Sequence, residues 1–254
     1  MKIAVICSDD RMIQIYDNLS KSFCVMDVYN VNDLETCKRE IDVLVLPVKG
    51  VDKEGKIACI RQKDEFWSEL KESVLIFCGL RNEFLEKLPY RTYYYMEDQG
   101  VIRDNAILTA EGVLNELIGC CARSIYDIQV DVIGYGNCGK VIYDILHNLH
   151  VNTRVIRRTC EKQEDFIEVN EYTTCGDVII NTSIGDVLNR ERMQQWTKRP
   201  VIIDIVTPDV IDMDAARELG ICIIKAGNLP GRFASVTAGN IIAEFIRGKL
   251  SNEG

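Results

Sequence analysis

An apolar segment that leads directly into closely spaced glycines constrains this chain more than any other feature of its sequence. Residues 131–140 read DVIGYGNCGK, with glycines in G-x-G-x-x-G spacing, and a helical pattern follows over 141–146. In such motifs the first glycine permits a tight turn, the second admits a pyrophosphate to the backbone, and the third lets the helix pack on the strand. The segment therefore predicts a dinucleotide site with its phosphates at the helix N-terminus. Its contacts would come from Gly134, Tyr135, Gly136, Asn137, Cys138 and Gly139.

Two arginines lie about 20 residues beyond the glycines, at the end of the next expected strand. Enzymes that use NAD usually carry an acidic residue here, which accepts hydrogen bonds from the ribose hydroxyls. This chain has Arg157, Arg158 and Thr159 instead. Arginine forms planar, charge-assisted pairs with phosphate, and the threonine adds a hydroxyl, so these residues favour NADP over NAD. The alternative is a pair of solvated arginines that end a strand.

Polar or loop-forming residues follow two further expected strands, at the strand ends that face the cofactor crevice in such folds. Asn181 and Thr182 follow the strand at 177–180, where they would border the nicotinamide ribose. An ordinary Asx or Ser/Thr turn explains them nearly as well. Leu229 and Pro230 lie in a loop after the last strand, which would bring backbone groups to the nicotinamide amide. A plain turn explains that loop equally well.

Residues that would act on a substrate are less clearly marked. Arg232 would face an anionic substrate, and Thr109, as the first residue of an expected helix, would offer that helix N-terminus to a carboxylate. Glu111 is a candidate base, although an acidic residue in a first helical turn commonly complements the helix dipole. His147 and His150 end the helix after the glycines, where histidine is favoured for dipole reasons, so neither is a catalytic candidate. Hydride transfer needs no Ser/His/Asp triad.

Composition argues against several other classes of protein. The 254 residues suffice for one large or two small domains, and the net charge of −9 argues against nucleic acid as a partner. We find no apolar run of about 18 residues and no signal-peptide pattern, so we expect a cytoplasmic protein without membrane contact. The 11 cysteines include no C-x-x-C pair and there are only two histidines, so we expect no metal site. Cys138, inside the glycine turn, is the thiol to test for oxidation or alkylation.

The order of apolar segments predicts an α/β protein of two α/β domains. The first, residues 1–108, lacks a glycine signature and is left for substrate or partner. Its strands are expected at 3–7, 42–47, 73–78 and 92–96, with a helical segment at 66–70. A long helix over 109–126 opens the second domain, 109–254, and a C-terminal helix over 237–249 should return to the first domain.

The second domain alternates strands with helices, which predicts a doubly wound parallel sheet, the Rossmann fold. Its strands are expected at 130–133, 153–156, 177–180, 201–205 and 222–224. This domain contains the glycines and the arginine pair, so it is the domain that would bind NADP.

Short motifs along nearly the whole chain resemble the dipicolinate synthase family, and within it the A subunit of this bacterial sporulation enzyme. They lie in the family's order at 3–6, 45–48, 109–112, 134–139, 180–182, 229–231 and 237–239. The resemblance implies an N-terminal α/β domain, a Rossmann domain, and NADP-dependent oxidation of dihydrodipicolinate, or of a hydroxy-tetrahydrodipicolinate precursor, to dipicolinate. It also implies a flavoprotein-like B subunit as partner.

The substrate of that reaction carries two carboxylates, so a site for it needs positive donors. Candidates are Arg232, Arg103, Arg81 and Lys49, with the helix N-terminus at Thr109, and the candidates for a catalytic group are Glu111 and Lys49. We also expect a homo-oligomer, because an exposed apolar face on the terminal helix would favour self-association.

The chain departs from the family at two places. It has Ser-Asp at 8–9, where family members have glycine, and Ser-Val at 235–236, where they have Pro-Lys. Two alternatives therefore stay open: a related two-domain NAD(P) dehydrogenase with another substrate, and a non-catalytic, dinucleotide-binding regulatory subunit.

Overall fold

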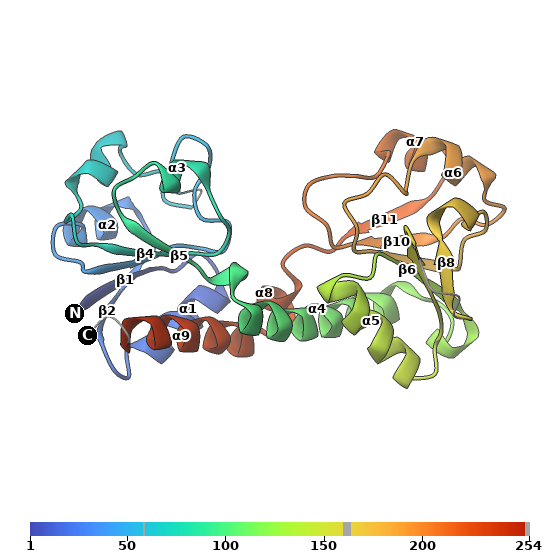
Figure 1. Cartoon of the computed structure of the whole chain (residues 1–254), viewed down its shortest axis with the longest axis horizontal. Coiled ribbons are helices and arrows are strands. Elements are labelled where there is room, and N and C mark those ends of the chain that lie inside the picture. The colour runs from blue at the N-terminus through green and yellow to red at the C-terminus, as the bar shows by residue number, and fades with distance from the viewer. Residues whose placement is uncertain (58, 160–163, 252–254) are drawn as a thin grey trace. The chain divides into compact units, whose positions relative to one another are not determined.

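The computed structural model describes residues 1–57, 59–159 and 164–251 (Figure 1). Contacts between Cα atoms divide the chain into two compact units, which we call unit 1 (Met1–Asn105 with Ala234–Gly254) and unit 2 (Ala106–Phe233). Each unit is built on a parallel sheet with helices, so the predicted α/β class is confirmed. The boundary between the units falls within helix α4, Gln99–Cys120.

Unit 1 contains a five-stranded sheet in the order β2-β1-β3-β4-β5, with every pairing parallel. The strands are β1 (Lys2–Ile6), β2 (Cys24–Val28), β3 (Val43–Val45), β4 (Leu75–Cys78) and β5 (Arg91–Tyr94). The sequence analysis predicts four of them. It misses β2 because this edge strand is only partly buried and therefore lacks a continuous apolar run.

Helices cover both faces of the unit 1 sheet (Figure 1). They are α1 (Asp10–Leu19), α2 (Val31–Cys37), α3 (Glu83–Glu86) and α9 (Ser235–Ser251), with short 3-10 helices η1 (Asp64–Glu69) and η2 (Tyr95–Glu97). Helix α1 begins at Asp10 because the Asp9 carboxylate accepts a hydrogen bond from the Met12 amide at 3.0 Å. Helix α9 packs on α1 and shares its core, so the C-terminal helix returns to the first domain as predicted.

Unit 2 contains a six-stranded parallel sheet in the order β11-β10-β9-β6-β7-β8, the strand order of a Rossmann domain. The strands are β6 (Gln129–Ile133), β7 (Asn152–Arg157), β8 (Phe166–Glu168), β9 (Val178–Asn181), β10 (Val201–Asp204) and β11 (Cys222–Lys225). The sequence analysis predicts all of these except β8, a three-residue edge strand too short to give a pattern.

The helices of unit 2 also cover both faces of its sheet. Helices α4 and α5 pack on one face, and α6 and α7 pack on the other. Their bounds are α5 (Asn137–Asn148), α6 (Arg190–Gln195), α7 (Met213–Glu218) and α8 (Leu229–Phe233), with 3-10 helices η3 (Ile125–Asp127) and η4 (Val169–Glu171).

Helix α4 begins at Gln99, well before the expected start at Thr109. The Asp98 carboxylate accepts from the amides of Gly100 and Val101 at 2.9 and 3.2 Å, which satisfies two N–H groups of the first turn. The prediction missed this cap because residues 99–108 do not continue the apolar stripe of the later turns. Within the described ranges, every helix is too short or too polar to span a membrane.

Candidate functional site

The glycine turn lies at the switch point of the unit 2 sheet. Strands β6 and β9 are neighbours at its centre, and successive connections lead away from this pair in opposite directions, which is where open α/β sheets bind ligands. Strand β6 ends at Ile133, Gly134 has a φ of +97°, and α5 begins at Asn137. The structure therefore has the predicted strand, turn and helix, with a glycine where side chains are disfavoured.

The three glycines of the turn face different surroundings. A Cβ on Gly139 would lie 2.3 Å from the carbonyl oxygen of Gly134, and a Cβ on Gly134 would lie 2.7 Å from Oγ1 of Thr182. A Cβ on Gly136 would meet no atom within 4 Å. The protein thus fills the space at the first and third glycines and leaves it open at the second. A bound pyrophosphate would need that open space, so the turn fits a dinucleotide.

The N-terminus of α5 provides donors for such a phosphate. Gly136 is the N-cap residue and has no side chain to accept from the first-turn amides. The first N–H groups of an α-helix have no partner within the helix, and they lie at the positive end of its dipole. Together with the open space beside Gly136, they form the type of anion site found in dinucleotide-binding folds.

A pocket of about 450 Å³ adjoins this turn within unit 2. Arg157, Arg158 and Thr159 line it, together with Gly134 and Tyr135. Arg157 is the last residue of β7 and is half-buried, whereas Arg158 and Thr159 are exposed. Among the residues that the structure describes, neither arginine forms an ion pair with a carboxylate. The structure therefore places the residues predicted for a 2′-phosphate beside those predicted for the pyrophosphate.

The side chains of Asn181 and Thr182 are engaged in bonds within unit 2. Asn181 Nδ2 donates to Asp204 Oδ1 at 2.9 Å, and Asn181 Oδ1 accepts from the Ser183 amide at 3.2 Å. Thr182 Oγ1 donates to the Ile133 carbonyl at 2.9 Å. The Asx-type turn that the sequence analysis kept as an alternative is therefore present. The Thr182 hydroxyl links this turn to the end of β6 through its hydrogen bond to Ile133.

Leu229 and Pro230 do not lie in an open loop. They begin the short helix α8, and both are buried. The Leu229 side chain contacts the backbone of α4, since a Cβ on Gly112 would lie 2.7 Å from the Leu229 Cβ atom. The predicted loop at Leu229 and Pro230 is therefore wrong, because Asn228, at a φ of 56°, turns the chain directly into this helix.

Two charged residues that the sequence analysis missed lie at the carboxyl ends of neighbouring strands. Asp204 ends β10 with a fully buried carboxylate, and Lys225 ends β11 with its Nζ 2.7 Å from Asp204 Oδ2. Lys225 also pairs with the exposed Asp209. Burial acts to lower the pKa of Lys225, but the two carboxylates outweigh burial and raise it. The sequence offered one sign of these residues, since each is a charged residue that ends an apolar run.

The substrate candidates of unit 1 differ in how far they are already paired. Arg81 donates to both carboxylate oxygens of Glu97, at 2.7 and 2.8 Å, and Arg103 donates to Asp104 at 2.9 Å. Lys49 is exposed on the turn that follows β3. A carboxylate ligand would have to compete with an existing partner at either arginine, whereas Lys49 forms no ion pair within the described ranges.

The candidates of unit 2 require one correction. Thr109 lies inside α4 and is 7% exposed, so the expected helix N-terminus at this residue is wrong. Glu111 is exposed in the same helix, away from its first turn, so it does not complement the dipole there. Arg232 pairs with Glu116, with 2.9 Å between Nη2 and Oε1.

Cys138 is half-buried in the first turn of α5. Burial raises the pKa of its thiol, and a hydrogen bond with Thr109 offsets part of that effect. His147 lies in the last turn of α5 and His150 follows it with a φ of 58°, so both lie at the end of the helix away from the glycines, as predicted.

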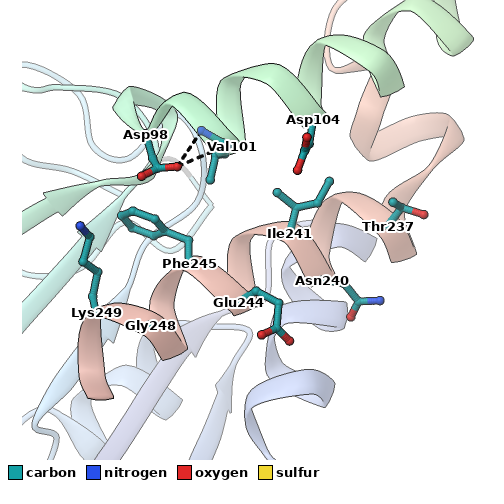
Figure 2. A pocket seen from close by; sticks show the side chains of 11 residues that line it. Asp98, Val101, Asp104, Thr237, Asn240, Ile241, Glu244, Phe245, Gly248 and Lys249 are labelled. Carbon is teal, nitrogen blue, oxygen red and sulfur yellow. Dashed lines mark hydrogen bonds between the residues drawn. The ribbon is translucent and has the colours of Figure 1, made fainter. Parts of the chain in front are cut away.

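A second pocket, of about 640 Å³, lies in unit 1 between α4 and α9 (Figure 2). Figure 2 shows Ile241 and Phe245 of α9 facing Val101 of α4, with Asp104 and Glu244 also on the lining. The described residues of this lining include three acidic side chains, Asp98, Asp104 and Glu244, against one cation, Lys249, and no arginine. The excess of carboxylates disfavours a phosphate in this pocket, so the glycine turn of unit 2 remains the candidate cofactor site.

Comparisons with known proteins agree with this architecture. No family model matches the chain. A curated relative, the dipicolinate synthase A subunit of Bacillus subtilis, is 26% identical, and the match covers 97% of this chain and 94% of the relative. The crystal structure of that A chain superposes with a TM-score of 0.82 at 24% identity, covering 99% of this chain and 96% of the other.

More distant solved structures share the fold. The dipicolinate synthase A subunit of Bacillus halodurans gives a TM-score of 0.82 at 21% identity over 98% of this chain and 97% of the other. The NAD-dependent formate dehydrogenase of Staphylococcus aureus, solved with NAD, gives 0.62 at 12% identity over 99% of this chain and 95% of the other. The chain is thus similar along its whole length to the dipicolinate synthase A subunit, which confirms the resemblance, and it has a fold that nicotinamide-dependent dehydrogenases also have.

Proposed function

We propose that this protein is an NADP-dependent oxidoreductase that oxidises dihydrodipicolinate, or a hydroxy-tetrahydrodipicolinate precursor, to dipicolinate. One observation supports the cofactor most strongly: Gly134 and Tyr135 of the glycine turn line a single pocket with Arg157, Arg158 and Thr159. The substrate assignment rests on the similarity to the dipicolinate synthase A subunit along the whole chain. By the same similarity we propose a cytoplasmic, sporulation-related role with a flavoprotein-like B subunit as partner.

The proposed reaction is chemically consistent. Oxidation of a dihydropyridine ring removes one hydride and one proton and leaves an aromatic ring, which gives the reaction a large driving force. A hydroxy-tetrahydrodipicolinate precursor would first have to lose one water molecule to form this dihydropyridine. Bound NADP would accept the hydride, and the proton would pass to a base or to water. Lys49 and Glu111, both exposed, are our candidates for the proton acceptor, and Lys49, Arg81, Arg103 and Arg232 are those for the substrate carboxylates.

The cofactor preference has a direct test. Replacing Arg157 and Arg158 together by glutamate should weaken NADPH binding far more than NADH binding, because only NADPH carries the 2′-phosphate. Binding can be followed by the fluorescence of the reduced nicotinamide. Equal losses for the two cofactors would contradict the assignment of NADP.

The reaction itself requires a turnover assay. The protein, with and without a flavoprotein-like B subunit, is mixed with NADP and enzymatically generated dihydrodipicolinate, and dipicolinate is followed by its ultraviolet spectrum. We expect dipicolinate in at least one of the two mixtures. If NADPH binds but neither mixture forms dipicolinate, the protein is instead a dehydrogenase for another substrate or a dinucleotide-binding regulatory protein. Light scattering on the same sample tests the proposed homo-oligomer.

A further inference from the structure

An aromatic side chain of the glycine turn lies against the first arginine of the NADP pocket. The guanidinium carbon of Arg157 is 5.5 Å from the centre of the Tyr135 ring, within the range of a cation–π contact. Tyr135 is the residue between the first two glycines of the turn, and Arg157 ends the adjacent strand β7. Both side chains line the same pocket.

The Tyr135 ring is itself held in place by two other rings. Its centre lies 5.0 Å from that of Phe166 in β8 and 6.0 Å from that of Tyr143 in α5, both in edge-to-face geometry. Phe166 and Tyr143 also contact each other, with 5.5 Å between ring centres. We call Tyr135, Tyr143 and Phe166 the aromatic platform.

A hydrogen bond anchors the platform on its α5 side. Tyr143 donates to Asp165 at 3.1 Å. Burial, and next the bond to Asp165, raise the pKa of Tyr143 to about 12, so this tyrosine stays a neutral donor at physiological pH. The platform is therefore supported by side chains of both α5 and β8.

An arginine needs such support to select a 2′-phosphate efficiently. Its side chain has many rotamers, and ordering it on binding reduces the affinity. A guanidinium that already lies over a ring has less freedom to lose on binding, and its N–H groups remain available for the phosphate. In the described part of the chain no carboxylate holds Arg157, so the ring is the group that orients it.

We propose that Tyr135 is a positioning residue that determines the preference for the 2′-phosphate by holding Arg157 on the aromatic platform. This inference rests on the proposed NADP function, because it gives Arg157 its ligand. It goes beyond that function in assigning the specificity to a residue that does not itself need to touch the phosphate.

The test uses two small ligands that differ only in the 2′-phosphate, adenosine 2′,5′-bisphosphate and 5′-AMP, measured by calorimetry on the full chain. The readout is the ratio of their dissociation constants. Tyr135→Leu should reduce the preference about two- to fivefold, the amount expected for an exposed cation–π contact. Tyr135→Phe keeps the aromatic face and should retain the preference. Tyr126→Leu, a tyrosine of unit 2 that is 62% exposed, is the matched control and should change nothing.

Two further variants keep the test decisive. Phe166→Leu removes a supporting ring but leaves Tyr135 and Arg157 themselves unchanged, and it should also reduce the preference for the 2′-phosphate. This variant replaces Tyr135→Leu if that protein proves unstable. Arg157→Ala should reduce the preference at least about tenfold, as for loss of a charge-assisted bond. If Arg157→Ala has no effect, the NADP assignment fails. If Arg157→Ala acts but Tyr135→Leu and Phe166→Leu do not, the positioning role is overturned and the NADP assignment stands.

Discussion

Nζ of Lys225 lies 2.7 Å from Oδ2 of Asp204 at the ligand-facing edge of the unit 2 sheet, and the carboxylate of this pair is fully buried. Asp204 Oδ1 also accepts from the side chain of Asn181, so the ends of β9, β10 and β11 are joined by one polar network. A buried carboxylate requires compensation, and Lys225 provides its only cation in the described ranges.

Lys225→Met should therefore destabilise the protein by leaving Asp204 without its cation. Loss of one partner from a fully buried pair costs about 3–5 kcal/mol, but Lys225 is 39% exposed, so we expect about 1–2 kcal/mol in urea unfolding. Asp209→Asn removes the exposed partner of the same lysine and should cost less than about 0.5 kcal/mol. Equal losses of unfolding free energy for Lys225→Met and Asp209→Asn would mean that the pair of Lys225 with the buried Asp204 does not stabilise the protein more than the exposed pair.

Substitutions at Gly136 and Gly139 of the glycine turn should affect different properties: the first should weaken cofactor binding, and the second should lower stability. Gly136→Ala adds a Cβ into open space at a φ of −83°, so the melting temperature should stay close to that of the wild type, while NADPH binding falls at least about tenfold. Gly139→Ala places a Cβ 2.3 Å from a backbone oxygen and should lower the melting temperature by several degrees. Thermal unfolding with and without NADPH measures both effects. Tight NADPH binding by Gly136→Ala would contradict the placement of the pyrophosphate.

Much of this architecture could be predicted from the sequence because buried parallel strands give continuous apolar runs. Strands β1, β9 and β10 all follow this pattern. The edge strands β2 and β8 could not be found, since partial exposure or a length of three residues removes the signal. The start of α4 was misplaced for a related reason: its cap is a single aspartate outside the apolar periodicity.

The geometry of the candidate cofactor site was more predictable than the surroundings of the candidate substrate residues. Glycine spacing and the position of Arg157 follow from the covalent sequence of one strand–turn–helix motif and its neighbour, so local patterns suffice. The partners of Arg81 and Arg232 are set by the fold, because Glu97 and Glu116 lie well away in sequence from the arginines that they pair with. The support of Arg157 by Tyr135 likewise depends on how β7 lies beside the turn.

Asp177 should make stability depend on acid pH. The Gln129 amide, at 2.9 Å, holds the pKa of this carboxylate below its usual range, and Lys198 and Arg123 act in the same direction, against the effect of burial. A depressed folded-state pKa stabilises the protein above the unfolded value of about 3.9 and loses that contribution as the pH falls through the folded value. Asp177→Asn should cost on the order of 1 kcal/mol at pH 7, and the difference should shrink below about pH 4. A difference in the free energy of unfolding between the wild type and Asp177→Asn that stays constant down to about pH 2 would contradict this prediction.

Cys138 should react slowly although it lies at a helix N-terminus. A helix N-terminus favours the thiolate, but burial raises the pKa of Cys138, and we expect burial to dominate. Iodoacetamide at about pH 8, followed by peptide mass spectrometry, should therefore modify the exposed Cys24 and Cys222 before Cys138. In urea, where the chain is unfolded, the three thiols should react at similar rates. This control tests whether neighbouring residues in the sequence, and not the fold, cause the difference in reactivity. Preferential modification of Cys138 in the native protein, suppressed by NADPH, would show instead that the helix N-terminus governs this thiol.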